Sequence, residues 1–201
     1  MPSRNVDISF DTKEYGSMIS RIPKNAKVVF KGIRFDVYHW QQRLRDGSHV
    51  TFEGIRRHDN VRILPVIGNK LFLAKERLID GRTVIGTFGG LAEHGEHPLA
   101  AAKRELLEES GFASKRWKLV HMEESPRSWS MDYKIYLFVA RDCKKVGEQK
   151  LDVSEEIEVK AVTLRQLLSL SSKWREFDLG VLRDARENAR NREKLSKLLF
   201  G

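Results

Sequence analysis

Residues 90–112 read GLAEHGEHPLAAAKRELLEESGF, and this stretch contains the signals that start and end a helix. Pro98 suits the first helical position, and Gly111 suits the residue that follows the last turn. The apolar residues between them recur at helical spacing: Leu99, Ala102 and Leu106. The sequence therefore predicts a helix over residues 98–110 with one face against a core.

Three glutamates of this helix fall within one narrow arc: Glu105, Glu108 and Glu109. Like charges repel at i,i+4, and carboxylates in the last turns face the negative end of the helix dipole, so each conflict costs a few tenths to about 1 kcal/mol. A divalent cation would reverse the sign of this penalty, because Mg²⁺ and Mn²⁺ take oxygen ligands. Taken alone, the glutamates indicate a solvated acidic helix face. The spacing of four further residues favours a metal site instead: Gly90, Glu96, Arg104 and Gly111.

The complete pattern of residues 90–112, Gly-x5-Glu-x7-Arg-Glu-Leu-x-Glu-Glu-x-Gly-Phe, resembles the signature box of the Nudix hydrolases. This resemblance implies the α/β class, as an α/β/α sandwich with a mixed β-sheet. It also implies a metal-dependent attack of water on a diphosphate that is linked to another moiety. The box specifies the bond that is broken and leaves the substrate open.

The resemblance also assigns roles by position. It implies that Glu105 and Glu109 are the principal ligands of Mg²⁺ (or Mn²⁺), that Glu108 is a further ligand or a polarising carboxylate, and that the Gly89 carbonyl is a backbone ligand. Arg104 joins the candidate catalytic residues, because it lies four residues before Glu108 and can hold that carboxylate in one rotamer. Three positions have structural roles: Gly90, Glu96 and Gly111.

The composition fits one main domain with a small extra layer, and it favours an anionic partner. The chain has 201 residues, and 37 Lys and Arg against 28 Asp and Glu give a net charge of +9. A single cysteine, Cys143, rules out an internal disulfide. We expect a cytoplasmic protein without a membrane partner, because no apolar run suits a signal peptide or a membrane span. Residues 183–197 mix both signs of charge, as solvated helix faces do, so we do not expect a nucleic-acid partner.

Alternating apolar and polar residues predict strands on both sides of the box. A small antiparallel unit comes first, with strands at residues 28–30, 34–42 and 49–55. Turns are predicted at Asp46-Gly47 in that unit and at Gly68-Asn69, which joins strands at residues 61–67 and 70–74. Strands after the box are predicted at residues 117–122, 133–140 and 157–162.

The two ends of the chain give weaker patterns. Thr163 with Gln166 resembles a capping box that begins a helix through Leu170. Asp178 is expected to cap one last helix that ends near Leu199. Residues 1–25 are polar, and we interpret them as a flexible arm or a capping segment.

Residues 29–66 resemble the N-terminal β-domain of Nudix enzymes that act on ADP-ribose and related nucleotide sugars. In that subfamily this domain commonly pairs with a second subunit, so the resemblance implies a homodimer. We therefore divide the chain into residues 1–60, an arm with a small dimerising antiparallel β-domain, and residues 61–201, the Nudix hydrolase domain with its C-terminal helix.

Four residues are candidates for substrate binding. Arg77 follows a strand where the subfamily has a substrate-facing arginine, and its guanidinium could bind a phosphate, although an exposed loop arginine is the simpler interpretation. Trp40 could stack on a base, with Arg34 or Arg57 nearby, although aromatic residues on strands more often serve in packing.

The segment LDVSEEIEVK, residues 151–160, corresponds to a carboxylate loop of the family. Glu155 best matches a further metal ligand, but Val153 occupies the position where ADP-ribose enzymes often have their general base. The base therefore stays open among four carboxylates: Asp152, Glu155, Glu156 and Glu108. A second departure is Thr87-Phe88 before the glycine pair, where ADP-ribose enzymes more often have glutamate and proline.

These patterns lead to one leading function and two alternatives. The leading hypothesis is Mg²⁺-dependent hydrolysis of a nucleoside diphosphate linked to another moiety, with ADP-ribose as the first case, to give two monophosphates. The first alternative keeps the chemistry and changes the substrate to a nucleoside triphosphate, a dinucleoside polyphosphate or capped RNA. The second is a domain that senses nucleotide sugars without catalysis, and the intact glutamates argue against it.

Overall fold

The computed structural model describes residues 22–124, 131–171 and 180–201. Residues 22–56 with 131–132 form one compact unit, and residues 57–124, 133–171 and 180–201 form the other. Most of the predicted N-terminal arm, and the proposed cap Asp178, lie outside the described residues.

The first unit is one sheet with the strand order β1-β2-β3-β9. Its strands are β1 (Lys27–Lys31), β2 (Phe35–Arg43), β3 (His49–Arg57) and β9 (Met131–Asp132). Strands β1 and β2 are antiparallel, as predicted, and β2 passes to β3 through the expected turn, where the Ser48 N–H donates to Asp46 Oδ1 at 3.0 Å. The short strand β9 pairs with β3 in parallel and was not predicted.

The second unit contains the predicted mixed sheet, with the strand order β12-β5-β4-β10-β8. Its strands are β4 (Asn60–Ile67), β5 (Lys70–Arg77), β8 (Arg116–Glu124), β10 (Lys134–Arg141) and β12 (Ile157–Val162). Strands β4 and β10 are parallel, whereas β10 with β8, β4 with β5 and β5 with β12 are antiparallel. Three short strands were not predicted: β6 (Thr83–Gly86), β7 (Phe112–Ala113) and β11 (Lys144–Lys145).

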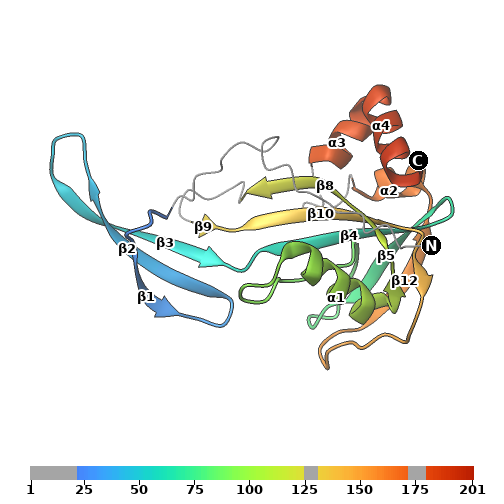
Figure 1. Ribbon diagram of the computed structural model, residues 1–201, viewed down its shortest axis with the longest axis horizontal. Coiled ribbons are helices and arrows are strands. Elements are labelled where there is room, and N and C mark those ends of the chain that lie inside the picture. The colour runs from blue at the N-terminus through green and yellow to red at the C-terminus, as the bar shows by residue number, and fades with distance from the viewer. Residues whose placement is uncertain (1–21, 125–130, 172–179) are drawn as a thin grey trace, which may run out of the picture. The chain divides into compact units, whose positions relative to one another are not determined.

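Helices cover both faces of this sheet, which confirms the α/β/α sandwich. Helix α1 (Pro98–Ser110) lies on one side, and α2 (Leu164–Ser171), α3 (Gly180–Glu187) and α4 (Ala189–Phe200) lie on the other (Figure 1). Each side has its own core, because alternate residues of a strand point to opposite faces. None of the helices in the described ranges is long and apolar enough to cross a membrane.

The predicted single C-terminal helix is wrong, because the chain breaks it in two at Asn188. This residue adopts an extended conformation, and its side chain accepts hydrogen bonds from the backbone N–H groups of Arg190 and Asn191, so it caps α4. The capping box before α2 is confirmed: the Gln166 N–H donates to Thr163 Oγ1, and the Thr163 N–H donates to Gln166 Oε1.

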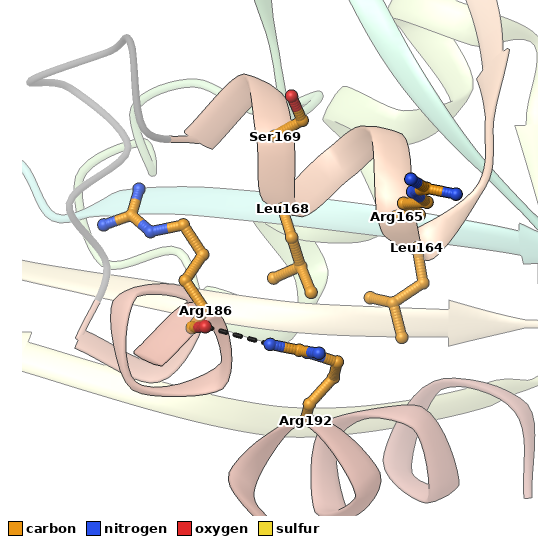
Figure 2. Close-up of a pocket in the computed structure, with 6 residues that line it drawn as sticks. All are labelled: Leu164, Arg165, Leu168, Ser169, Arg186 and Arg192. Carbon is orange, nitrogen blue, oxygen red and sulfur yellow. Dashed lines mark hydrogen bonds between the residues drawn. The ribbon is translucent and has the colours of Figure 1, made fainter. Parts of the chain in front are cut away.

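Helices α2, α3 and α4 leave a pocket of about 660 Å³ among them (Figure 2). Its lining residues are Leu164, Arg165, Leu168, Ser169, Arg186 and Arg192. The Arg192 guanidinium donates to the Ala185 carbonyl at 3.2 Å and to the Arg186 carbonyl at 2.9 Å. Arg192 therefore caps the C-terminal end of α3.

Removal of the Asn188 cap should destabilise this helical layer. We expect Asn188→Ala to lower the free energy of unfolding by about 1 kcal/mol, because two backbone N–H groups lose their acceptor. Urea denaturation measures this change. Asn191→Ala is the matched control, since it removes an asparagine from the first turn of the same helix and leaves the cap in place. Equal unfolding midpoints for the two variants would contradict the assignment of the cap.

Candidate active site

The predicted helix over residues 98–110 is confirmed, and both of its ends are capped. His97 is the N-cap, and its Nδ1 accepts from the Leu99 N–H at 3.2 Å. Gly111 ends the helix with φ at 68°, in the left-handed region that favours glycine. A Cβ at Gly111 would lie 2.1 Å from the Gly147 carbonyl oxygen, so no other residue fits there without displacing the neighbouring loop.

Arg104 connects the loop before α1 to the carboxylates on it. Its guanidinium donates to both Glu96 carboxylate oxygens, at 3.2 and 3.0 Å, and to the Leu91 carbonyl at 3.1 Å. One terminal nitrogen also donates to Glu105 at 2.8 Å and to Glu108 at 3.1 Å. Glu96 in turn accepts from the Glu93 N–H at 2.9 Å, so it connects the loop to the helix. Pairing with Arg104 lowers the pKa of Glu96 and keeps it ionised.

The glycine pair of the box approaches the helix closely. A Cβ at Gly90 would lie 2.5 Å from a carboxylate oxygen of Glu105, so the absence of a side chain leaves room for that carboxylate. The Gly89 N–H donates to Glu109 Oε2 at 2.8 Å. The carbonyls of Phe88 and Gly90 accept from strand β4, whereas no described residue donates to the Gly89 carbonyl. Gly89 as a backbone metal ligand stays a prediction.

Glu109 carries the most strongly perturbed carboxyl of this helix. The residue is 8% exposed, and burial raises its pKa to about 8, against the hydrogen bond from Gly89, which lowers it. The negative charges of Glu105, Glu155 and Glu76 raise it further. Burial also raises the pKa of Glu105, and Glu108 and Glu155 add to that effect, although Arg104 opposes it. These charges therefore gather at one end of α1.

The structure distinguishes the carboxylates of the loop before β12. Glu155 is partly buried and acts on the pKa of both Glu105 and Glu109, and its own carboxylate accepts from the Asp152 N–H at 3.0 Å. Glu156 is exposed and lies 3.7 Å from the Arg77 guanidinium. Asp152 and Val153 are also exposed. Of these loop carboxylates, Glu155 is the one whose charge raises the pKa of both Glu105 and Glu109.

Glu76 was not among the predicted site residues, although its charge also raises the pKa of Glu109. It lies on β5 opposite Ile157 of β12. Phe72 and Ala74 of the same strand pack in the core below α1, so the alternation of the strand directs Glu76 to that face as well. This alternation was readable in the sequence, but only once the face of β5 that meets α1 was known.

The carboxylates at this helix end have the oxygen ligands that a hard divalent cation prefers. In this structure they form hydrogen bonds with protein groups instead. Across residues 22–124, 131–171 and 180–201, no three acidic, histidine or cysteine side chains already form a metal-binding cluster. Arg104 engages Glu105, and the Gly89 N–H engages Glu109. No lysine, arginine or histidine in the described part of the chain pairs with Glu109, so its buried carboxylate lacks a counter-charge that Mg²⁺ or Mn²⁺ could supply.

The candidate substrate residues are distributed over both units. In the second unit, Arg77 is exposed at the end of β5, and the Arg57 guanidinium lies 4.8 Å from the centre of the Tyr133 ring. In the first unit, Arg34 is exposed in the turn before β2. Trp40 packs edge-on against Phe52, with 5.8 Å between ring centres, so it contributes to packing within its sheet.

The profile of the NUDIX domain matches residues 56–185, which is more than half of the chain. The chain belongs to the Nudix family. It is 30% identical over 154 residues to the ADP-ribose pyrophosphatase of Bacillus subtilis (strain 168), and the match covers 75% of this chain and 82% of that protein. A solved structure described as an ADP compounds hydrolase shares the fold, with a TM-score of 0.64 and 22% identity over 89% of this chain and 95% of that one.

These similarities confirm the family and the fold class that the box indicated. The chain is a Nudix hydrolase of the pyrophosphatase type, similar to ADP-ribose pyrophosphatase. Nudix enzymes generally use a divalent metal, and the carboxylates of this Nudix helix have the chemistry to hold one.

The raised pKa of Glu109 predicts how the stability of the metal-free protein depends on pH. The carboxyl titrates near 4.5 when exposed and at about 8 in the folded chain, so the folded state binds more protons between these values. Its contribution to stability is full below about pH 4.5 and is lost as pH rises through about 8. Glu105 acts in the same direction.

We therefore expect the melting temperature in EDTA to fall as pH rises towards about 8. Glu109→Gln should flatten this dependence, because the amide does not titrate. Melting curves across this pH range measure the effect in both proteins. Parallel curves for the parent and Glu109→Gln would show that Glu109 titrates normally.

Proposed function

We propose that this Nudix hydrolase uses Mg²⁺ (or Mn²⁺) to hydrolyse the diphosphate of a nucleoside diphosphate linked to another moiety, most closely ADP-ribose or a related nucleotide sugar. The products are two monophosphates. The observation that supports the chemistry is the placement of two box carboxylates beside the glycine pair: Glu109 accepts from the Gly89 N–H at 2.8 Å, and Glu105 occupies the space that a Cβ at Gly90 would fill. Similarity to ADP-ribose pyrophosphatase over most of both chains supports the substrate class.

Each residue of the site has a distinct part in this proposal. Glu105, Glu109, Glu155 and the Gly89 carbonyl would hold the metal, with Glu108 as a further ligand. When bound, the metal polarises phosphoryl oxygens and makes water a better nucleophile. Arg104 keeps Glu105 and Glu108 in fixed orientations through hydrogen bonds of 2.8 and 3.1 Å.

The general base must be a carboxylate that can contact water. Glu108 is 40% exposed at its side chain and hydrogen-bonded on one oxygen, which leaves the other oxygen available for a proton. Glu155 is the second candidate, because it lies in the carboxylate group. Asp152 and Glu156 are less favoured, since both are exposed and Glu156 already lies 3.7 Å from the Arg77 guanidinium.

Substrate binding would depend on cations outside the carboxylate group. Arg77 has a largely exposed guanidinium whose nearest carboxylate lies 3.7 Å away, so it can exchange that partner for a phosphate. Arg57 and Arg34 are further candidates for phosphate or ribose. We retain Trp40 as a stacking candidate, although its ring already contacts Phe52.

Hydrolysis of ADP-ribose by the purified protein with Mg²⁺ tests this proposal. We expect AMP and ribose 5-phosphate, identified by chromatography and mass spectrometry. Glu109→Gln should lower kcat/KM about 100-fold or more, because loss of a ligand costs at least as much as loss of an outer-shell partner. The matched control is Glu193→Gln on α4, an exposed glutamate paired with Lys197.

The same screen separates the alternatives. Other nucleotide sugars, nucleoside triphosphates, dinucleoside polyphosphates and capped RNA are tested in parallel. Preference for one of the last three would overturn the substrate class and keep the Nudix chemistry. An unchanged rate in Glu109→Gln would overturn the metal assignment itself.

We also propose a homodimer formed through the N-terminal β-domain of residues 1–60. Apolar residues at and after β1 are exposed, which favours a partner surface: Val28, Val29, Phe30, Ile33 and Phe35. The partner in this proposal is a second copy of the chain, as the subfamily resemblance implies. Residues 61–201 would then form the hydrolase domain.

A charge placed on this apolar surface should separate the subunits. We expect Phe30→Asp to shift the sedimentation coefficient from that of a dimer to that of a monomer, because an unpaired carboxylate would be buried at the interface. Ile79→Asp is the control, since Ile79 is an exposed apolar residue of the second unit. A parent that sediments as a monomer would contradict the proposal.

A further inference from the structure

The C-terminal end of α1 is covered by the segment that begins at β11. Four carbonyls at this end receive hydrogen bonds from that segment, in the pairs Lys150 to Glu108, Gln149 to Glu109, Lys145 to Ser110 and Val146 to Gly111. The last carbonyls of a helix have no partner within it, so such bonds stabilise the helix end. Two of these donors are side chains, those of Lys145 and Gln149.

Gln149 differs from the other donors because its amide binds a second carbonyl. Nε2 donates to the Glu109 carbonyl at 2.6 Å and to the Ile157 carbonyl at 3.0 Å. A glutamine amide has two N–H groups, so both bonds can form at once. The amide therefore joins the end of α1 to the first residue of β12.

The two carbonyls bound by Gln149 lie at or near carboxylates of the site. Glu109 itself provides the first carbonyl, and Ile157 follows Glu155 by two residues. Ile157 is also opposite Glu76 in the pairing of β5 with β12. When they are ionised, the carboxylates of Glu109, Glu155 and Glu76 repel one another, and the Gln149 bridge joins the two segments against that repulsion.

The burial of Gln149 matches this role. Every residue of the stretch 144–150 is exposed except Gln149, which is partly buried. Its side chain is thus directed inward, between the helix end and the strand. Lys145 reaches the same helix end but makes no described bond to β12, and its side chain is about half exposed.

We propose that Gln149 is a positioning residue of the metal site, whose side-chain amide fixes the spacing between Glu109 on α1 and Glu155 before β12. The inference rests on the proposed metal-dependent function. Outer-shell residues of this kind orient the ligands and thereby tune metal affinity. Gln149 contacts neither metal nor substrate in this role.

Binding of Mn²⁺ without substrate, measured by electron paramagnetic resonance, tests the proposal. We expect Gln149→Met to raise the Mn²⁺ dissociation constant about tenfold, because methionine has a similar length but no donor. Lys145→Met is the matched control: it also removes one side-chain bond to the end of α1, but it leaves the bridge intact. Its dissociation constant should stay within about twofold of the parent value.

Turnover gives a second readout. At saturating metal, kcat of Gln149→Met should fall while KM for the nucleotide sugar stays near the parent value, because the substrate contacts are unchanged. Gln149→Asn keeps the amide on a shorter side chain, so it should lie between Met and the parent. It also serves as the test variant if the Met variant fails to fold.

The outcomes separate this inference from the function on which it rests. A parent that binds no Mn²⁺ overturns the metal site. A parent that binds Mn²⁺, with an equal dissociation constant in the Gln149 variants, overturns the role of Gln149 alone. Equal weakening in Gln149→Met and Lys145→Met would show that both residues act only by stabilising the helix end.

Discussion

The burial of the Glu109 carboxyl is the constraint on which the rest of the site depends. A carboxylate that is 8% exposed, with one backbone N–H as its partner, is unfavourable in an ordinary protein core. Its position near the C-terminal end of α1 adds the unfavourable pole of the helix dipole. A divalent cation relieves both penalties at once, so the local conflict becomes favourable in the metal-bound protein.

The neighbouring residues compensate some of these charges and leave others available. Arg104 binds Glu96, Glu105 and Glu108, so one guanidinium offsets part of the charge of three carboxylates and connects the loop to the helix. No comparable cation reaches Glu109 within the described residues. The carboxylates therefore differ in role. Glu96 and Glu108 are held by Arg104 and fix the loop and the helix, whereas Glu109 can exchange its hydrogen bond for a metal. Glu105 belongs to both groups, because Arg104 opposes the effect of burial on it.

Local sequence patterns predicted most of the longer helices and strands. The site residues that were not predicted depend on contacts between distant parts of the chain. The bounds of α1 and the capping box before α2 follow from nearest-neighbour chemistry and were readable directly. The break at Asn188 was missed because the apolar spacing continues through it, although asparagine is a strong N-cap residue. Glu76 and Gln149 act through strands and loops that approach α1 only in the folded chain. The residues next to Gln149 give no sign of its contacts, and the alternation that places Glu76 is informative only once the face of β5 that meets α1 is known.

In the second unit, the candidate active site lies on one face of the sheet, and a separate hydrophobic core lies on the other face. Glu105, Glu109 and the core beneath them lie on the α1 face, whereas α2, α3 and α4 build an independent core on the other face. Arg141 of β10 connects the sheet to α4, because its guanidinium donates to the last carbonyls of that helix. The sheet between the layers is close-packed and resists deformation. A substitution among α2, α3 and α4 should therefore alter how much protein is folded before it alters the arrangement of the carboxylates.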